Sequence, residues 1–544
     1  GITDSLVVIC LAERLDQGAN EQSMNTTEFL MISAAIVPDR TAVIFEDRRV
    51  TFEEMQARAN RLSNALADAG VVSGDRVAIL EVNTDRYVEA YFATAKLDAI
   101  FVPLNFRARA DELSYMINDA TPKVVLAGPR YEDLVKSFSG DVECVDHYIS
   151  LEGEVDGWLS YESITDAASE DEMMFPEAGD DDISMLMFTA GTTGFPKGVM
   201  LTHESFSSYV LSNVMPADPD EEERNILTVP LYHIAGMQAV ISAIYGGRTL
   251  IIQRQFEPEE WMKLVETERA DRAMMVPTML KMLMEHENFS SHDLSSLKVI
   301  TYGAASMPLE VIKRAIAEFP GTSFINAFGA TETAATITML PPEDHMLTGT
   351  EEEVEKKLKR LSSIGKPLDD VEVRILGEDG EPMPVGEVGD IVARGGRVMK
   401  GYWNMEEATA ETIRGGWLFT GDLGYEDEDG YIFLTGRARE IIKRGGEMIS
   451  PEEVEQVLRS HPELDDAAII GIPDLDWGER VRAIVVAKAG VVVDEADVIE
   501  FCRQRLASYK KPESVVVTSE LPRNPLGKVL KTTLREQFDA PITG

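Results

Sequence analysis

Short apolar runs alternate with amphipathic segments over the first two thirds of the chain. The clearest predicted helix starts at Thr51, which has a glutamate at capping-box spacing, and ends at Gly70. Four short apolar runs have the length and composition of buried strands: 77–80, 123–126, 249–252 and 299–302. This alternation predicts α/β layers whose sheets are mostly buried.

The pattern changes from about Ile364. Short strands separated by glycine turns are predicted from there on, as in 371–375 and 389–393. Such spacing is typical of a β-rich subdomain rather than of alternating helices and strands.

A third pattern begins after Gly436. Ser450 is a predicted N-cap, with Pro451 at the first helical position and Glu453 at the spacing that closes a capping box. Two strands and a second helix complete the predicted unit: 467–472, 481–487 and 495–506. This succession predicts a small α+β unit.

Together these patterns predict an α/β protein with two domains. The large N-terminal domain consists of two α/β-layered subdomains plus a β-rich subdomain, and a small mobile α+β C-terminal domain follows it. A chain of 544 residues exceeds one ordinary hydrophobic core, which favours this division. We place an extension at 1–23, with disorder left open, the N-terminal domain at 24–436 and the C-terminal domain at 437–544.

The composition narrows the range of partners. The formal net charge of -44 argues against nucleic acid and against anionic membrane surfaces, which require a basic face. No apolar run of the sequence approaches the length of a membrane span. The three cysteines are scattered and show no CxxC spacing, so we expect a reducing, cytoplasmic location.

A glycine- and threonine-rich loop with one lysine directly follows the apolar run 183–188. It reads Thr-Ala-Gly-Thr-Thr-Gly-Phe-Pro-Lys-Gly over 189–198. Glycines let main-chain N–H groups turn inward around an anion, threonine hydroxyls add donors, and Lys197 adds a positive charge. Pro196 stands where a Walker A loop requires glycine. The loop predicts phosphate binding; taken alone, it is equally typical of a flexible surface loop.

Four further segments follow in order: 326–333, 417–423, 436–447 and 521–528. With the phosphate loop, this set resembles the adenylate-forming superfamily of acyl-CoA synthetases, peptide-synthetase adenylation domains and beetle luciferases. The resemblance covers the chain from about Met24 to Glu536 and is closest to bacterial fatty-acyl and medium-chain acyl-CoA synthetases. It implies an AMP-binding domain followed by a catalytic lid domain.

The resemblance also implies a reaction in two steps. A carboxylate attacks the α-phosphate of ATP to give acyl-AMP, and the thiol of coenzyme A then displaces AMP. We therefore expect a ligase of fatty-acid metabolism that uses ATP, Mg²⁺ and coenzyme A on a fatty or medium-chain acid. Alternatives are an aryl- or branched-acid:CoA ligase, or a stand-alone adenylation enzyme that loads a carrier protein. A homodimer is left open.

The resemblance implies that residues from several segments bind the nucleotide. Thr331 matches an α-phosphate contact, and Glu332 matches the glutamate associated with Mg²⁺. Phe328 stands where the family has a tyrosine that stacks on adenine. Asp422 matches the aspartate that binds both ribose hydroxyls, and Arg437 matches a second ribose or phosphate contact. The other expected nucleotide contacts are Thr189, Gly191, Thr192, Thr193, Gly194, Lys197, Gly303, Ala304, Ala305, Asn326 and Gly329.

The C-terminal segments supply the expected catalytic lysine and the coenzyme A contacts. Lys528 matches the lysine that bridges the substrate carboxylate and the α-phosphate. Arg439 stands at the family's hinge, which is commonly aspartate or lysine. After adenylation, the hinge is expected to bring the Gly445–Gly446 loop to the coenzyme A thiol. Trp477 is predicted either to stack on the adenine of coenzyme A or to pack in the core.

The acid is expected to occupy an apolar pocket. His233 matches a residue that lines the acyl and thiol tunnel; a satisfied core histidine is the alternative. The other expected lining residues are Met237, Ile241, Tyr302, Ala304 and Ala330.

The phosphate loop departs from the family pattern at one position. Ala190 stands where the family usually has serine, so one hydroxyl donor is missing.

Overall fold

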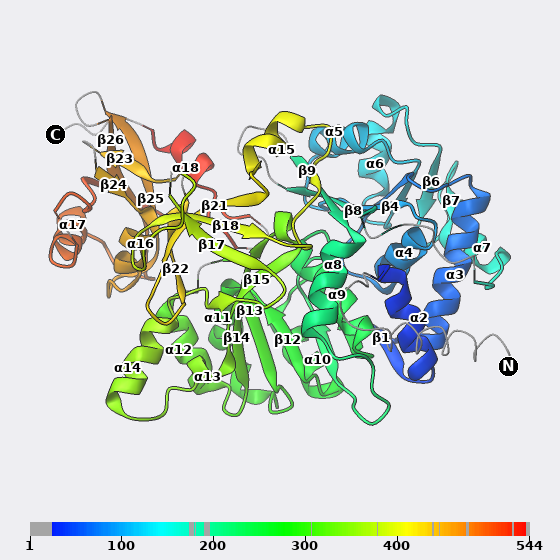
Figure 1. Cartoon of the computed structure of the whole chain (residues 1–544), viewed down its shortest axis with the longest axis horizontal. Helices are drawn as coiled ribbons and strands as arrows, with labels where there is room; N and C mark the ends of the chain where they lie inside the picture. Colours follow the sequence, from blue (N-terminus) through cyan, green and yellow to red (C-terminus); the bar gives the residue numbers. More distant parts are fainter. Residues whose placement is uncertain are drawn as a thin grey trace.

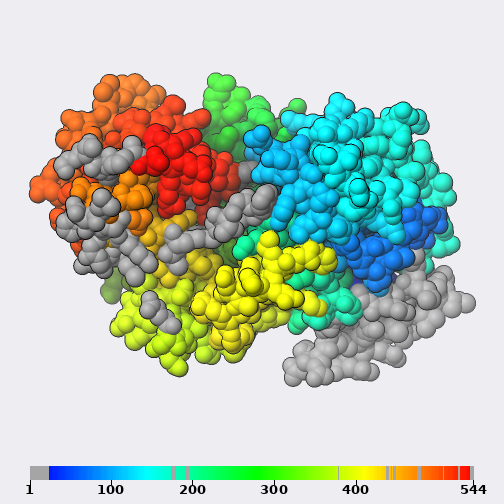
Figure 2. Space-filling view, turned by 90° about the horizontal axis from the view of Figure 1, so that it is seen from above, coloured from blue at the N-terminus to red at the C-terminus, as the bar shows by residue number. Residues whose placement is uncertain are grey.

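The computed structural model describes most of the chain (Figure 1). The described residues are 24–172, 179, 181–189, 196–305, 307–377, 379–437, 440–444, 447–474, 478–506, 508–524 and 527–539. Within them, two large α/β bodies lie side by side, a β-rich sheet packs between them, and the C-terminal residues gather at one end of the molecule (Figure 2).

The first α/β body contains a sheet of eight strands within the described residues. Their spatial order is β19-β9-β8-β4-β3-β5-β6-β7. The strands are β3 (Arg76–Leu80), β4 (Ile100–Pro103), β5 (Val124–Ala127), β6 (His147–Ser150), β7 (Leu159–Ser160), β8 (Ile183–Thr189), β9 (Lys197–Thr202) and β19 (Gly401–Tyr402). The helices are α3 (Phe52–Asp68), α4 (Asp85–Ala95), α5 (Ala110–Ala120), α6 (Glu132–Phe138) and α7 (Tyr161–Ala167). Strands β3 to β8 run parallel, with β3, β4 and β5 largely buried, whereas β9 and β19 are antiparallel additions.

The second α/β body contains a sheet of nine strands within the described residues. Their order is β16-β15-β14-β13-β12-β10-β11-β1-β2. The strands are β1 (Thr41–Phe45), β2 (Arg48–Thr51), β10 (Arg224–Leu227), β11 (Thr249–Ile252), β12 (Arg272–Met275), β13 (Val299–Gly303), β14 (Ser323–Ala330), β15 (Ala335–Leu340) and β16 (Lys366–Pro367). The helices are α2 (Thr26–Ile36), α8 (His203–Asn213), α9 (Ile234–Tyr245), α10 (Pro258–Glu268), α11 (Pro277–Glu285), α12 (Leu309–Glu318), α13 (Pro342–His345) and α14 (Glu351–Arg360).

The remaining strands form two antiparallel-rich sheets. The β-rich subdomain contains β17 (Glu372–Leu376), β18 (Gly389–Arg394), β20 (Ile413–Arg414), β21 (Trp417–Glu426), β22 (Ile432–Arg437) and the helix α15 (Glu406–Thr412). The C-terminal unit contains β23 (Ile442–Arg444), β24 (Glu447–Ile449), β25 (Leu464–Asp474), β26 (Gly478–Ala487), β27 (Ser514–Thr518), α16 (Pro451–Arg459), α17 (Glu495–Arg503) and α18 (Lys531–Gln537). The first unit is therefore rich in strands and the second combines helices and strands, as the sequence predicts.

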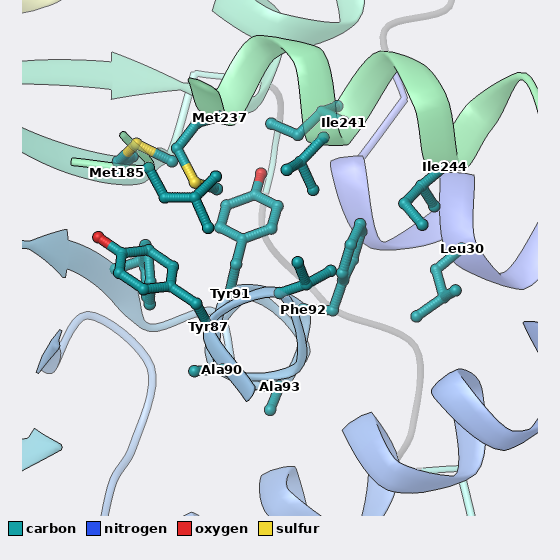
Figure 3. Packing of buried hydrophobic residues seen from close by; sticks show 14 of the residues in the cluster. Leu30, Tyr87, Ala90, Tyr91, Phe92, Ala93, Met185, Met237, Ile241 and Ile244 are labelled. Carbon is teal, nitrogen blue, oxygen red and sulfur yellow. The ribbon is translucent and has the colours of Figure 1, made fainter. Parts of the chain in front are cut away.

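The largest apolar core lies where the helices of the two α/β bodies meet. Figure 3 shows Met237 and Ile241 of α9 directed toward Tyr91 of α4, with Ile244 farther along α9 beside Leu30 of α2. All five side chains are fully buried. Burial of large side chains across this contact holds the two bodies together.

The helix caps agree with the sequence in one case and differ in another. At α3, Glu54 N donates to Thr51 Oγ1 at 3.2 Å, and Thr51 N donates to Glu54 Oε2 at 2.8 Å, so the predicted capping box is confirmed. At α16, Ser450 Oγ accepts from Glu453 N as expected. The carboxylate of Glu453, however, binds the ammonium of Lys510 at 2.7 Å, because a charged partner outcompetes a main-chain donor.

Of the helices in the described residues, none is both long and apolar enough to cross a membrane.

One buried carboxyl group should make stability depend on pH. Glu81 follows β3, is 3% exposed, and accepts a hydrogen bond from Val82 N at 2.7 Å. Burial raises the pKa of Glu81 to about 7. Its pKa is thus higher in the folded than in the unfolded state, so its contribution to stability is complete below the unfolded pKa and is lost as pH rises through 7.

We expect Glu81→Gln to stabilise the protein more at high pH than at low pH. Between about pH 5 and about pH 8, the gain in unfolding free energy should grow by roughly 2 to 3 kcal/mol. Denaturant unfolding at the two pH values measures it, with the exposed Glu143→Gln as control. A gain that is the same at both pH values would contradict the account.

Candidate active site

The strands β8 and β9 hold the two ends of the predicted phosphate loop together. Thr189, the last residue of β8, lies opposite Lys197, the first residue of β9, and Thr189 Oγ1 donates to the carbonyl oxygen of Lys197 at 3.5 Å. The predicted loop contacts at Gly191 to Gly194 lie outside the described residues. The ammonium of Lys197 lies 4.7 Å from the centroid of the Tyr402 ring.

Glu332 contacts the hydroxyl of the same tyrosine. It belongs to the 3-10 helix η3 (Thr331–Thr333), which follows β14. The hydroxyl of Tyr402 donates to Glu332 Oε1 at 2.9 Å, and Met399 N donates to the main-chain oxygen of Glu332 at 2.9 Å. Tyr402 therefore brings together the predicted phosphate lysine and the predicted metal-associated glutamate.

Sequence analysis did not find Tyr402. It lies 70 residues from Glu332 in the sequence and forms part of a strand of two residues, β19, that pairs with β9. No local spacing marks it, since neither hydrophobic periodicity nor a charged cluster surrounds it. Its importance follows from the strand pairing alone.

The two segments that are expected to contact adenine and the acyl group lie together at the carboxyl ends of β13 and β14. Strands β13 and β14 are parallel neighbours, with Tyr302 opposite Asn326 and Gly303 opposite Ala327. Their carboxyl ends therefore reach the same edge, where ligands commonly bind in open α/β sheets. Ala304 and Ala305 follow the first strand at this edge; Gly329 and Ala330 end the second, and Thr331 follows it.

Small residues at this edge permit close approach of the main chain. A Cβ atom at Gly303 would collide with the carbonyl oxygen of Ala327, and one at Gly329 would collide with the main chain of Ala335. Ala304 adopts a φ of 65°, a left-handed conformation that costs free energy for a residue with a side chain. Such a conformation, next to a predicted ligand, is characteristic of functional sites.

The predicted adenine contacts lie at the border with the β-rich subdomain. Asn326 Nδ2 donates to the carbonyl oxygen of Ser363 at 3.1 Å. The ring of Phe328 is half-buried and packs against apolar side chains that include Ile364 and Ile337. Its role as the stacking partner of adenine stays a prediction.

The predicted ribose contacts come from adjacent strands. Asp422 of β21 is 8% exposed and lies directly opposite Arg437 of β22 in the antiparallel pair. Asp422 N donates to Thr420 Oγ1 at 3.1 Å. Nothing is described of the side chain of Arg437, so a joint role for the two residues stays a prediction.

The loop that carries Lys528 packs against the large domain. Lys528 N donates to Asn524 Oδ1 at 2.8 Å, which closes the loop. A Cβ atom at Gly527 would come within 2.6 Å of Thr278 Oγ1, at the start of α11. Helix α11 follows β12, the neighbour of β13. The loop therefore lies beside the sheet edge where the expected acyl and adenine segments end.

A second contact supports this arrangement of the C-terminal unit. Lys281 Nζ of α11 donates to Asp465 Oδ1 of β25 at 3.1 Å. The predicted hinge Arg439, the predicted coenzyme A loop Gly445–Gly446, and Trp477 lie outside the described residues.

His233 is half-buried, and its Nε2 atom is buried. It is the N-cap of α9, and its ring centroid lies 4.2 Å from that of Tyr232. Burial, with a smaller effect of Arg107, lowers the pKa of His233 to about 3, so the imidazole is neutral near pH 7. No described residue hydrogen-bonds to His233 Nε2. Its place in the acyl and thiol tunnel, with a satisfied core histidine as the alternative, therefore stays a prediction.

The other predicted lining residues divide into two groups. Ala304 is exposed and Ala330 is half-buried at the sheet edge. Met237 and Ile241 are fully buried in the core shown in Figure 3, and Tyr302 is fully buried with its hydroxyl 2.9 Å from His345 Nε2. An acyl chain would reach these buried side chains only after they move, so their contact with the acid stays a prediction.

The order of these segments matches that of a known family. A family model described as AMP-binding enzyme matches residues 32–403. The chain belongs to the AMP-binding enzyme family. A second model, the C-terminal domain of AMP-binding enzymes, matches residues 453–528. The predicted border at 436/437 falls between the two matches and stays a prediction.

Relatives of this AMP-binding enzyme extend over nearly its whole length. It is 36% identical to a feruloyl-CoA synthase from Amycolatopsis sp, over 93% of this chain and 97% of that protein. It is 34% identical to the long-chain-fatty-acid–CoA ligase FadD13 of Mycobacterium tuberculosis, over 91% and 94% of the two chains. The structure of ATP-bound MatB from Rhodopseudomonas palustris matches with a TM-score of 0.84 and 30% identity, over 95% and 99% of the two chains. The predicted superfamily and fold class are confirmed.

Asp422→Ala should weaken binding of AMP and ATP alike, because both nucleotides carry the ribose. Loss of hydrogen bonds to a charged group predicts a drop in affinity of roughly 10- to 100-fold. Isothermal titration with each nucleotide measures it. Asp429→Ala in the turn between β21 and β22 serves as control, since Asp429 forms exposed ion pairs with Lys356 and Arg360. Unchanged AMP affinity in Asp422→Ala would refute the ribose assignment.

Proposed function

We propose that this AMP-binding enzyme activates a fatty or medium-chain carboxylic acid and transfers it to coenzyme A. The enzyme is an ATP-dependent acid:CoA ligase of the AMP-forming class. A carboxylate oxygen of the acid attacks the α-phosphorus of ATP, and pyrophosphate leaves with the electrons of the broken P–O bond. The thiol sulfur of coenzyme A then attacks the acyl carbon, AMP leaves, and the thiol proton passes to solvent.

The observation that carries this proposal is that one tyrosine contacts both the predicted phosphate lysine and the predicted metal-associated glutamate. Lys197 and Glu332 both contact Tyr402, and Glu332 directly follows β14. Gly527, next to Lys528, lies against Thr278 of α11, the helix that follows β12, and β12 is two strands from β14 in the same sheet. Preorganised charges of this kind stabilise charge that develops on phosphate during transfer.

These residues fit Mg²⁺ as a companion of ATP. Mg²⁺ is usually held by one or two carboxylates together with substrate phosphates and water, not by a protein cage. Glu332 offers one carboxylate, and the described residues contain no group of three or more His, Cys, Asp or Glu that could hold a metal alone. Bound there, Mg²⁺ would neutralise charge on the pyrophosphate part of ATP.

Lys528 is proposed to bind the two reacting oxygens. Its compact ammonium can donate to the carboxylate of the acid and to the α-phosphate together, which reduces their repulsion and orients the attack. The neutral His233 is proposed to border the acyl carbon without adding charge to it. Asp422 is proposed to fix the ribose.

The substrate class is the finer part of the proposal. The likeness to the long-chain-fatty-acid–CoA ligase FadD13 supports a fatty or medium-chain acid. The likeness to feruloyl-CoA synthase favours the alternative of an aryl acid. A cytoplasmic location and a homodimer remain predictions from the sequence.

A panel of acids tests the substrate proposal. Pyrophosphate release is measured with straight-chain, branched and aryl acids, each with and without coenzyme A. We expect the highest kcat/KM for straight-chain acids and acyl-CoA as product. A higher value for an aryl acid would contradict the fatty-acid proposal. Acyl-AMP that accumulates in the presence of coenzyme A would indicate a carrier protein as acceptor.

Lys528→Ala should separate the two half-reactions. Adenylation should slow by on the order of 100- to 1,000-fold, because charge stabilisation at the α-phosphate is lost. Thioester formation from preformed acyl-AMP should be largely spared. Each half-reaction is timed separately, and equal loss in both would refute the role of Lys528.

A matched lysine controls for loss of positive charge on the C-terminal unit. Lys488 Nζ donates to the carbonyl oxygen of Pro462 at 2.7 Å within that unit. Lys488→Ala should leave both half-reactions near their normal rates.

A further inference from the structure

Tyr402 is held in place by the main chain around it. Residues 399–403 are bonded to both neighbouring bodies: Met399 N donates to Glu332 O at 2.9 Å, Lys400 N to Met200 O at 2.9 Å, and Trp403 N to Gly198 O at 2.7 Å. Tyr402 N donates to Thr409 Oγ1 at 2.9 Å, and the residue is 8% exposed. Its ring therefore has a fixed position.

In this position one neutral side chain contacts two opposite charges. The Tyr402 hydroxyl donates to Glu332 Oε1, and its ring lies near the ammonium of Lys197. Within the described part of the chain, no ion pair involves either Lys197 or Glu332. A direct Lys–Glu pair would neutralise both groups, and it would have to break before phosphate and metal could bind.

Tyrosine satisfies both neighbours without neutralising either. A phenol hydroxyl donates one hydrogen bond, which fixes the rotamer of the carboxylate and leaves its negative charge in place. The negative face of the ring attracts an ammonium. Each charged group is thereby oriented while it remains available to a ligand of opposite charge.

We propose that Tyr402 is a positioning residue for magnesium–ATP. It holds Glu332 so that the carboxylate faces the metal, and it keeps Lys197 beside Glu332 without pairing. The inference rests on the proposed function, because Glu332 and Lys197 act on the metal and phosphates there. Residues that orient a metal-binding carboxylate commonly change metal affinity by about 10- to 100-fold when removed.

Tyr402→Phe tests this role because it removes the hydroxyl and keeps the ring. The Mg²⁺ concentration for half-maximal pyrophosphate release should rise about 10-fold or more. The rate at saturating Mg²⁺ should change far less. Thioester formation from preformed acyl-AMP, in which no pyrophosphate is released, should keep its normal rate. Tyr402→Leu, which also removes the ring, should in addition raise the KM for ATP.

Tyr431→Phe is the matched control. The Tyr431 hydroxyl donates to Asp344 Oδ2 at 2.7 Å, and Tyr431 is 6% exposed. Like Tyr402, it donates its hydroxyl to a carboxylate, but to one that is neither Glu332 nor a partner of Lys197. We expect Tyr431→Phe to lower the melting temperature and to leave the Mg²⁺ dependence unchanged.

Binding of ATP gives a readout that does not need turnover. Mg²⁺ should increase the affinity of the unmodified enzyme for ATP, and Tyr402→Phe should lose about 10-fold of this increase with AMP affinity unaltered. An equal Mg²⁺ effect in both proteins would overturn the role of Tyr402. Absence of acid-dependent pyrophosphate release from the unmodified enzyme would instead overturn the proposed function, and the binding experiment would still decide the role of Tyr402.

Discussion

The hydrogen bond from Tyr402 to Glu332 joins the two sheets on which the candidate active site is built. Tyr402 belongs to the eight-stranded sheet through β19, and Glu332 follows β14 of the nine-stranded sheet. The segment before Tyr402 is anchored by Arg397, which is fully buried, pairs with Asp370 and lies 4.7 Å from the Tyr209 ring centroid. A buried charge of this kind is strongly destabilising if its partner is lost, so the segment has little freedom to shift. The position of the predicted phosphate-binding Lys197 relative to the predicted metal-binding Glu332 therefore depends on packing that lies away from both residues.

The net charge of -44 makes this local arrangement important, because ATP is also an anion and receives no attraction from the protein as a whole. Cations in the C-terminal unit do not compensate, since several are already paired: Arg523 with Asp466, Lys510 with Glu453, and Lys531 with Glu455. Affinity for phosphate must instead come from a few cations held at fixed positions and from main-chain N–H groups. Small displacements of these groups would weaken the binding of ATP. The orientation of Glu332 is therefore important for binding.

Much of the fold follows from local patterns in the sequence. The helix after Thr51, the buried strands and the order of the domains are determined by hydrophobic spacing and caps, and the structure confirms them. What could not be predicted depends on contacts between distant residues. Tyr402 reaches Glu332 only through strand pairing, Glu453 binds Lys510 instead of closing its cap, and Met237 and Ile241 are buried by helices that pack from elsewhere in the chain. The motif residues that define the family were visible in the sequence, whereas the residue that connects them was not.

We propose that Lys197, Tyr402 and Glu332 form one unit that receives magnesium–ATP. A crystal structure with Mn²⁺ and a non-hydrolysable ATP analogue tests it most directly, because the anomalous signal of Mn²⁺ locates the metal independently of the protein atoms. The account predicts a single metal peak about 2 Å from a carboxylate oxygen of Glu332, with Tyr402 still bonded to that carboxylate and Lys197 on the phosphates. A metal bound only by phosphates and other side chains, with Glu332 turned away, would contradict it.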